Sequence, residues 1–411
     1  MVMNNLQGKN IIIGVTGGIA AYKTLEFIRL LRKAGAEVQV VLTPAASEFI
    51  TPLTVQALSG NKAHQSLLDS DAELAMGHIE LAKWADAIVI APASADFLAR
   101  LTAGMANDLL STLCLATAAP LFIAPAMNQQ MYLQTVTQEN LATLQQRGII
   151  QIGPNNGSQA CGDIGPGRMV EPQEIFVQLE AFFIPQDLTD LKVTITAGPT
   201  REAIDPVRFL SNHSSGKMGF SLAQAFAKRG AKVTLIAGPV NLATPNNVHR
   251  INVISADEML EQSLMLAPQS DIFIGCAAVA DYKPAKILPH KMKKVDIQGQ
   301  QLDEKLHLDL VKNPDIIATI SALTENRPFV VGFAAETQNL AHYAQDKLQR
   351  KNLDLICAND VSEGKGFNQE QNALQLFWSQ GHKTLPLSHK ELLAKQLAEQ
   401  ISLLYKTKKD L

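Results

Sequence analysis

The chain of 411 residues has only four cysteines, Cys114, Cys161, Cys276 and Cys357, and none of them forms a CxxC pair. This scarcity and this spacing exclude a disulfide-based scaffold, and they do not suggest a structural zinc site. A reducing compartment is the simplest location for such cysteines. We therefore expect a cytoplasmic protein.

Long apolar runs are also missing, although 46% of the residues are hydrophobic. No run approaches the ~18 residues needed to cross a bilayer. The start of the chain is polar, and the apolar run that follows it contains Gly14, Gly17 and Gly18, which is typical of a strand entering a turn and not of a signal peptide. We expect no membrane partner.

Charge is divided unevenly along the chain. Residues 1–190 contain 10 basic and 17 acidic residues, whereas residues 191–411 contain 26 and 22, which gives formal charges of −7 and +4. The difference fits ordinary surface variation, or a second half that handles more anionic ligands. Neither value is typical of a nucleic-acid-binding domain, so no nucleic-acid partner is expected.

The length exceeds the roughly 100–200 residues of one domain, and both halves alternate short aliphatic runs with segments of helical period. Such runs are typical of strands buried on both faces of a parallel sheet. We predict an α/β fold with two doubly wound, mostly parallel-sheet domains, residues 1–190 and 191–411. The predicted strands are 11–15, 37–42, 87–91 and 121–124, then 193–196, 233–237, 272–278, 329–333 and 355–358.

Each predicted domain opens with a strand that enters a glycine-rich turn. The first turn, GVTGGIA at residues 14–20, does not have the GxGxxG spacing of a dinucleotide site. It could wrap a single phosphate, as a flavin mononucleotide requires, or be an ordinary turn. In the second half, SNHSSGKM at 211–218 fails the P-loop pattern at Ser211 and Met218. That loop suits an anionic ligand or a simple helix entry.

Five residues are candidates for a catalytic or binding role, and most of them also have a purely structural interpretation. His78 begins a predicted helix, where a lone histidine is more often a packed or surface residue. Cys161 lies in a polar loop, which favours a reactive thiol because free cysteine is usually buried. Asn128 follows the end of a strand and is either a turn residue or an amide that contacts a ligand, whereas Asp281 ends a strand with a carboxylate that suits a metal or a ribose. Lys291 opens the run KMKK, which is a solvated face or a flap that neutralises a triphosphate.

The motifs of the first half, taken together, resemble those of the flavin-dependent cysteine decarboxylases. They are GGIAAYK at 17–23, GHIEL at 77–81, APAS at 91–94, GMAND at 104–108, PAMN at 125–128 and ACGD at 160–163. The second half resembles the phosphopantothenate–cysteine ligases through AGPTRE at 197–202, DPVR at 205–208, SNHSSGKMG at 211–219 and NPDI at 313–316. Their fusion in this order is similar to the bacterial bifunctional proteins of coenzyme A biosynthesis.

For the second half, the resemblance implies a Rossmann-like ligase that acts first, on 4′-phosphopantothenate and cysteine. CTP activates the pantothenate carboxylate as an acyl-cytidylate, and the amine of cysteine displaces CMP. Lys291 is implied in forming the acyl-cytidylate and Asn212 in its conversion, with Mg²⁺ as a cofactor whose ligands stay unnamed. The implied CTP-binding residues are Gly275, Cys276, Ala277, Asp281, Lys291, Pro314, Asp315, Ile316, Ile317, Phe333, Lys347 and Lys351.

For the first half, the resemblance implies a flavodoxin-like domain in which FMN oxidises the thiol of phosphopantothenoylcysteine, so that CO₂ is lost. The ene-thiolate that remains is reduced to 4′-phosphopantetheine. His78 is implied as the base, Cys161 as the proton donor of the reductive step and Asn128 as the partner of the substrate carboxylate. The implied FMN-binding residues are Gly17, Gly18, Ile19, Thr43, Ser94 and Asn107.

The resemblance also implies a homo-oligomer, a dodecamer built from trimers of the flavin domain and dimers of the ligase domain. FMN would then lie at a subunit interface. One alternative is a flavodoxin-like redox carrier fused to a nucleotide-binding domain, without catalysis. An electron carrier has no use for both Cys161 and His78, which favours the enzyme. A nicotinamide-dependent dehydrogenase is disfavoured by the missing GxGxxG.

Overall fold

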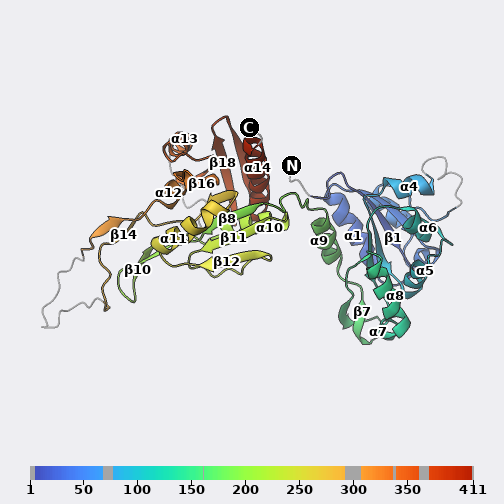
Figure 1. Ribbon diagram of the computed structural model, residues 1–411. Helices are drawn as coiled ribbons and strands as arrows, with labels where there is room; N and C mark the ends of the chain where they lie inside the picture. Colours follow the sequence, from blue (N-terminus) through green and yellow to red (C-terminus); the bar gives the residue numbers. More distant parts are fainter. Residues whose placement is uncertain are drawn as a thin grey trace. The chain divides into compact units, whose positions relative to one another are not determined.

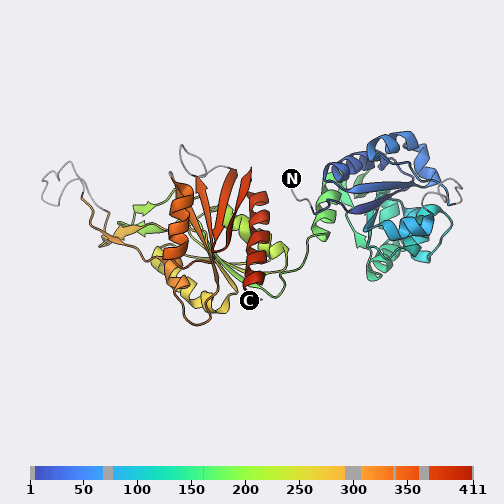
Figure 2. The ribbon, with the colours of Figure 1, turned by 90° about the horizontal axis from the view of Figure 1, so that it is seen from above.

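The computed structural model describes residues 5–67, 77–160, 162–291, 307–336, 339–360 and 370–409. The chain divides into two compact units, Met1–Ile184 and Pro185–Leu411. Each unit is built on its own mostly parallel sheet with helices on both faces, so the predicted α/β class is confirmed (Figures 1 and 2). None of the described helices is long and apolar enough to cross a membrane.

The first unit has a five-stranded parallel sheet in the order β2-β1-β3-β4-β5. Its strands are β1 (Asn10–Val15), β2 (Glu37–Leu42), β3 (Ala87–Ala93), β4 (Leu121–Pro125) and β5 (Ile150–Gln151). A separate hairpin joins β6 (Asn155–Ser158) and β7 (Ile164–Arg168). The strand order changes direction between β1 and β3, where ligands bind in open sheets of this kind.

Helices cover this sheet on two faces because the strands bury apolar side chains on both sides. One core packs Phe27 and Ile28 of α1 against Ile11, Ile13 and Val15 of β1. A second core on the opposite face joins Ile12 to α4, α5 and α6. The helical elements are α1 (Ala21–Lys33), η1 (Pro44–Glu48), α2 (Pro52–Ser59), α4 (His78–Trp84), α5 (Ala95–Ala103), α6 (Leu109–Ala116), α7 (Gln129–Leu133), α8 (Thr135–Gln146) and α9 (Pro172–Phe182).

The second unit has an eight-stranded sheet in the order β12-β11-β8-β13-β16-β17-β18-β19. The strands from β12 to β17 are parallel and have the Rossmann order, whereas β18 and β19 are antiparallel additions that the strand pattern did not predict. Its strands are β8 (Lys192–Ala197), β11 (Lys232–Ala237), β12 (Val248–Asn252), β13 (Ile272–Gly275), β16 (Phe329–Glu336), β17 (Leu355–Asp360), β18 (Gln371–Trp378) and β19 (Gly381–His389).

Two helices, α10 and α14, cover one face of this sheet and pack against each other through residues such as Phe226 and Leu397. The opposite face is covered by α11, α12 and α13, as Figure 2 shows from above. The helical elements are α10 (Lys217–Lys228), α11 (Ala256–Leu266), η2 (Ala267–Gln269), α12 (Ile316–Ser321), α13 (Leu340–Arg350) and α14 (Lys390–Lys409).

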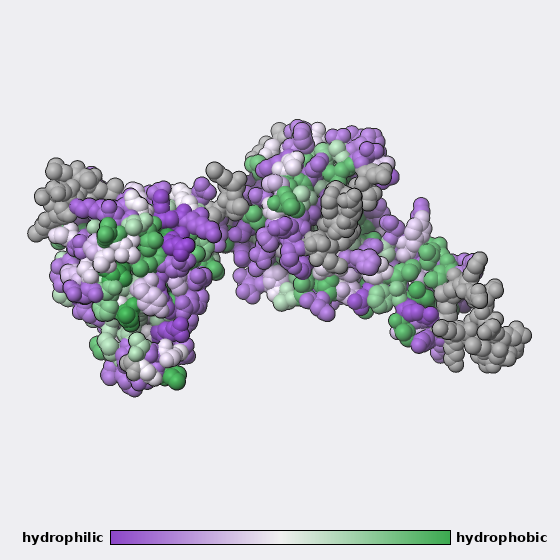
Figure 3. Space-filling view, turned by 180° about the vertical axis from the view of Figure 1, so that it is seen from behind, coloured by the Kyte–Doolittle hydropathy of each residue, from purple (hydrophilic) through white to green (hydrophobic). Residues whose placement is uncertain are grey.

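Two small hairpins extend from the second unit beyond its sheet. One pairs β9 (Arg201–Ala203) with β10 (Phe209–Ser211), and the other pairs β14 (Tyr282–Pro284) with β15 (Leu310–Lys312). Apolar side chains gather on this extension (Figure 3), among them Phe209, Ile287 and Leu310, which are at least 45% exposed.

Candidate active sites

A cavity of about 1150 Å³ lies at the carboxyl edge of the first sheet, beside the change of strand order. The loops after β1, β2, β3 and β4 line it, so residues distant in sequence meet there. All of the residues predicted to bind FMN are in its wall: Gly17, Gly18, Ile19, Thr43, Ser94 and Asn107. Asn128 lines the same cavity.

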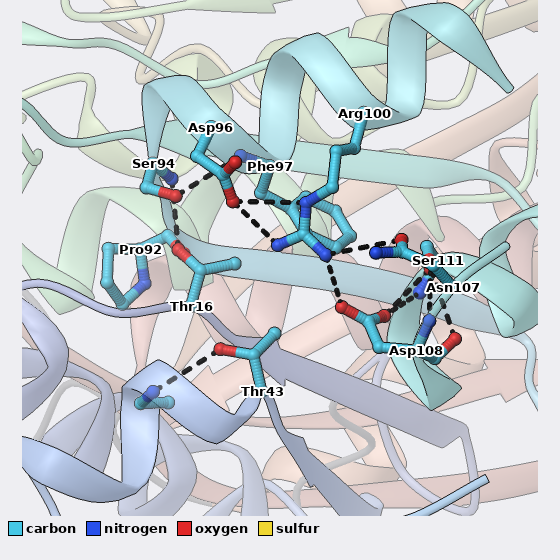
Figure 4. A network of polar contacts seen from close by, with 11 residues as sticks. Thr16, Thr43, Pro92, Ser94, Asp96, Phe97, Arg100, Asn107, Asp108 and Ser111 are labelled. Atoms are coloured by element: carbon cyan, nitrogen blue, oxygen red, sulfur yellow. Dashed lines mark hydrogen bonds and ion pairs between the residues drawn. The ribbon is translucent and has the colours of Figure 1, made fainter. Parts of the chain in front are cut away.

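Hydroxyl groups join loops and cap helices around this cavity (Figure 4). Thr16 Oγ1, just after β1, donates to the carbonyl of Pro92 at 2.7 Å and accepts from the backbone N–H of Ser94 at 3.0 Å. Thr43 and Ser94 cap η1 and α5, where their hydroxyls accept from the N–H groups of Ala46 and Phe97. These contacts hold two helix starts, those of η1 and α5, beside the cavity, which is a suitable environment for a phosphate.

The two neighbouring glycines of the first turn have different tasks. A Cβ on Gly17 would lie 2.5 Å from the Cβ of Ala45, so the turn after β1 approaches the turn after β2 only with glycine here. A Cβ on Gly18 would meet nothing within 4 Å, although Gly18 is in the cavity wall. Gly17 therefore serves the fold, and Gly18 leaves space for a ligand.

An ion-pair network forms the wall near Asn107 (Figure 4). The Arg100 guanidinium lies 2.7 Å from a carboxylate oxygen of Asp96 and 2.6 Å from one of Asp108. Asp108 also caps α6 by accepting from the N–H and hydroxyl of Ser111 at 2.7 and 2.8 Å. Burial alone would raise the pKa of Asp108, but the hydrogen bonds from Ser111 and Arg100 outweigh it and lower that pKa below its ordinary value.

The β6–β7 hairpin borders the cavity from the side of β4. Asn128 Nδ2 donates to Asp163 Oδ2 at 2.8 Å, and Gln159 Nε2 donates to the carbonyl of Pro166 at 3.1 Å. Ser158, Gln159 and Ala160 line the cavity. Cys161 follows them directly in the chain but lies outside the described residues, so its expected role stays a prediction.

His78 is the first residue of α4 and is half buried. It is not among the described residues that line the first cavity. Helix α4 packs against α6 through the core that contains Leu81 and Ala82, on the face opposite to α1. The expected base and the expected FMN-binding residues are therefore not brought into one cavity within the described part of a single chain.

In the second unit, the change of strand order falls between β8 and β13. A smaller cavity of about 160 Å³, which we call the inner cavity, lies at this edge. Close backbone approach builds it, because a Cβ on Gly216 would lie 3.3 Å from the Cα of Gly198, and both glycines have positive φ. The inner cavity is lined by Ser214, Ser215, Gly216, Lys217, Met218, Gly219, Cys276, Ala277, Ala278, Phe333, Ala335, Asn359, Asn372 and Lys390.

Three of the predicted CTP-binding residues, Cys276, Ala277 and Phe333, line the inner cavity. Asn212, which is predicted to act in converting the acyl-cytidylate to product, lies nearby, since its Nδ2 donates to the carbonyl of Ala278 at 3.1 Å. Burial raises the pKa of the Cys276 thiol to about 12, which makes it a poor nucleophile at neutral pH.

Most of the remaining predicted CTP-binding residues, but not Lys291, form a neighbouring group around the start of α12. A Cβ on Gly275 would lie 2.6 Å from Ile317, and Lys351 forms an ion pair of 2.7 Å with Asp315. The carbonyl of Asp281 accepts from the N–H of Asn313 at 2.9 Å. Pro314 and Ile316 flank Asp315 in the chain, and Lys347 precedes Lys351 by about one helical turn on α13.

Lys291 is exposed, and three residues before it the N–H of Leu288 donates to the carbonyl of Ile204 at 3.0 Å. Lys293 and Lys294 lie outside the described residues. Within the described part of the chain, no group of three or more His, Cys, Asp or Glu could hold a metal ion.

Sequence reasoning missed several residues of both sites. Arg100 and Lys23 line the first cavity, and Lys23 is 7% exposed, with its Nζ 2.8 Å from Glu171. The i, i+4 spacing of Asp96 and Arg100 is a helical ion-pair pattern that could have indicated Arg100. Lys390 of the inner cavity had no such signal, since it begins a helix well beyond the last of the motifs of the second half.

Comparison with known families now defines the class. Residues 2–183 match the family model described as Flavoprotein. Residues 188–404 match the DNA/pantothenate metabolism flavoprotein C-terminal domain. The chain thus joins an α/β flavoprotein unit to a pantothenate-metabolism unit.

Individual relatives define the family. The coenzyme A biosynthesis bifunctional protein CoaBC of Haemophilus influenzae is 68% identical over 96% of this chain and 98% of its own. CoaBC of Escherichia coli is 57% identical over 98% of this chain and 99% of its own. Among solved structures, the FMN binding protein AtHal3 is 31% identical, with a TM-score of 0.38, over 43% of this chain and 97% of that chain.

The chain belongs to the family of CoaBC proteins. It is a bifunctional enzyme of coenzyme A biosynthesis, with a phosphopantothenate–cysteine ligase activity and a phosphopantothenoylcysteine decarboxylase activity. The expected fold class and the expected enzyme are confirmed.

A matched pair of variants tests the two glycine roles. Gly17→Ala should lower the melting temperature of the flavin-free protein, because its Cβ collides with Ala45. Gly18→Ala should leave that melting temperature unchanged and lower only the amount of flavin retained, as measured by absorbance. Equal melting temperatures for the flavin-free variants would contradict the assignment.

The Asp108 network predicts a defined pH dependence. Because the pKa of Asp108 is lowered by folding, its charged form stabilises the protein at neutral pH, and this contribution is lost as the pH falls below the ordinary value of 3.8. Asp108→Asn should lower the free energy of unfolding by about 1–2 kcal/mol at pH 7, as expected for a hydrogen-bonded charge. The difference from wild type, measured with urea, should shrink below pH 4.

Asp96→Asn is the matched control for this experiment. The Asp96 side chain binds the same guanidinium but is 73% exposed, so solvent screens its contribution. The Asp96 variant should differ little from wild type at any pH. A difference for Asp108→Asn that stays constant from pH 7 to pH 3 would show that its charge is not responsible.

Proposed function

We propose that the first unit binds FMN in its cavity and decarboxylates phosphopantothenoylcysteine, and that the second unit ligates 4′-phosphopantothenate to cysteine with CTP. The observation that carries the proposal is the convergence of six predicted FMN-binding residues and Asn128 on one cavity from five loops. Residues 1–190 and 191–411 are the proposed decarboxylase and ligase domains.

The residues of the first cavity fit FMN. Its phosphate would meet the N–H groups of Gly17 and Gly18 and the hydroxyl of Ser94, where Gly18 leaves space. The cavity, at about 1150 Å³, exceeds the roughly 300–1,000 Å³ of ordinary ligand sites, so it has room for a cofactor together with substrate. The bound flavin would supply the reversible oxidation of the substrate thiol that allows CO₂ to leave.

The surrounding side chains would orient the substrate and move its protons. Asn128 would bind the cysteinyl carboxylate, and the bond of its Nδ2 to Asp163 fixes the amide that would do so. Cys161, which follows Ala160 in the chain, would donate the proton of the reductive step while the β6–β7 hairpin keeps water from the ene-thiolate. His78 would act as the base.

In the second unit, the nucleotide would bind at the carboxyl edge between β8 and β16. Lys291 would stabilise the charge that develops as the acyl-cytidylate forms, and Asn212 would assist its attack by the amine of cysteine. The predicted CTP contacts fall into two neighbouring groups, one at the inner cavity and one around Asp315. Mg²⁺ would bind mainly through the nucleotide phosphates, which needs no cluster of protein carboxylates.

We also propose a homo-oligomer, a dodecamer, in which a second copy completes the flavin site. Apolar side chains at the rim of the cavity support this, since Ile19 and Tyr22 are 62% and 60% exposed. The position of His78 outside the described lining of its own chain's cavity is a second support. A cytoplasmic location fits the free thiols of Cys114, Cys276 and Cys357.

Incubation of the purified protein with phosphopantothenate, cysteine and each nucleoside triphosphate in turn tests both activities. Mass spectrometry should detect CMP, phosphopantothenoylcysteine and then CO₂ and 4′-phosphopantetheine with CTP. The protein should be yellow. A flavin-containing protein that forms neither CMP nor CO₂ under these conditions would refute the proposal.

His78→Asn separates the two halves. The variant should retain its flavin and its CMP formation, but the rate of CO₂ release should fall at least ~100-fold, as is usual when a catalytic base is removed. Lys291→Gln is the reciprocal control, which should stop CMP formation and leave CO₂ release from added phosphopantothenoylcysteine intact. Near-normal CO₂ release by His78→Asn would show that His78 is not the base.

A further inference from the structure

Two cavities of the second unit meet at a pair of lysines. Lys217 and Lys390 line the inner cavity, and both also line a larger outer cavity of about 630 Å³ on the other side of them. The outer cavity runs between α10, the loop at residues 242–246 and the start of α14. None of the predicted nucleotide contacts lies in it, whereas the inner cavity contains three of them.

Lys390 is one of two buried lysines among the described residues, the other being Lys23 of the first unit, and 8% of Lys390 is exposed. It is the first residue of α14, and its backbone N–H donates to the carbonyl of Glu370 at 3.0 Å. Glu370 itself forms an ion pair with Lys217 and has a side chain that is 71% exposed. Desolvation, and then the charge of Lys217, lower the pKa of Lys390, and the charge of Glu370 offsets part of this effect.

The positions of the two lysines increase this positive potential. Lys217 is the first residue of α10 and Lys390 the first of α14, and these two helices pack against each other. A cation at the start of a helix is opposed by the positive end of the helix dipole, so these are unfavourable positions for lysine in the absence of an anion. An anion between them would be attracted by both ammonium groups and by both helix starts, which would offset this repulsion.

The rest of the inner cavity wall also suits an anion. Among its described lining residues, the charged side chains are Lys217 and Lys390, and the polar ones are the hydroxyls of Ser214 and Ser215 and the amides of Asn359 and Asn372. All of these groups can donate hydrogen bonds. The volume of about 160 Å³ is below the roughly 300 Å³ of small-ligand sites, so it fits one part of a substrate and not a whole nucleotide.

We propose that Lys390 binds a phosphoryl group of a ligase substrate in the inner cavity, together with Lys217. The group enters between the two ammonium ions, and Lys217 exchanges part of its contact with Glu370 for the phosphoryl oxygens. This proposal rests on the ligase activity of the second unit. Two substrates carry suitable groups, the phosphate monoester of phosphopantothenate and the phosphates of the nucleotide.

The test is a comparison of Lys390→Gln, Lys390→Arg and wild type in the full-length enzyme. CMP formation is measured with phosphopantothenate and CTP varied separately. Lys390→Gln should raise the KM of one of these substrates about 10- to 100-fold, because a hydrogen bond between charged groups is lost, whereas Lys390→Arg should restore most of it. A rise confined to phosphopantothenate assigns the monoester, and a rise confined to CTP assigns the nucleotide.

Two controls separate binding from folding. Lys228→Gln removes a charge from the exposed, opposite end of α10 and should leave both KM values unchanged. Release of CO₂ from added phosphopantothenoylcysteine should be normal in every variant. Inorganic pyrophosphate and inorganic phosphate serve as probes, and at least one should inhibit wild type more strongly than Lys390→Gln.

Different results would contradict the role of Lys390 and the proposed ligase function. Unchanged KM values and unchanged inhibition in Lys390→Gln would overturn the assignment of Lys390. A lower melting temperature with a fall in kcat alone would do the same, and would assign Lys390 to the packing of α14. If wild type forms no CMP with any nucleotide, the proposed ligase function fails instead.

Discussion

In both units, the strand order reverses direction beside the first strand, so the loops that follow neighbouring strands separate at one point of the carboxyl edge. Backbone N–H groups at helix starts face the space that opens there, and phosphate groups are suited to them. The position of each cavity is thus a consequence of sheet topology. The side chains decide only what the cavity can bind.

The two units use this edge differently. In the first, Thr16 joins the loops after β1 and β3, and Thr43 and Ser94 cap η1 and α5. The cavity between them has room for a cofactor and a substrate. In the second, the turn at Gly198 lies against Gly216, and the remaining inner cavity is much smaller. The second unit therefore divides its proposed ligands between the inner cavity and the surface around Asp315, whereas the first holds them in one space.

The charged side chains in the walls of the two cavities also differ. The wall of the first cavity places Arg100 between Asp96 and Asp108, so its charges compensate within the protein. The inner cavity of the second unit places Lys217 and Lys390 together, and the neighbouring carboxylate of Glu370 is exposed. The excess of positive charge in residues 191–411 is thus concentrated in part at a site, which a count of charges cannot reveal.

The sequence by itself determined the α/β class and both series of central strands, because continuous aliphatic runs can be satisfied only by strands buried on two faces. The resemblance of its motifs to a known family also implied six residues of the first cavity, among them Gly17, Thr43 and Ser94. Only the tertiary structure decided that β18 and β19 turn antiparallel, that His78 lies apart from the cavity of its own chain, and that Lys390 faces Lys217. Such facts depend on which elements pack together, and packing joins residues that no local pattern of the sequence connects.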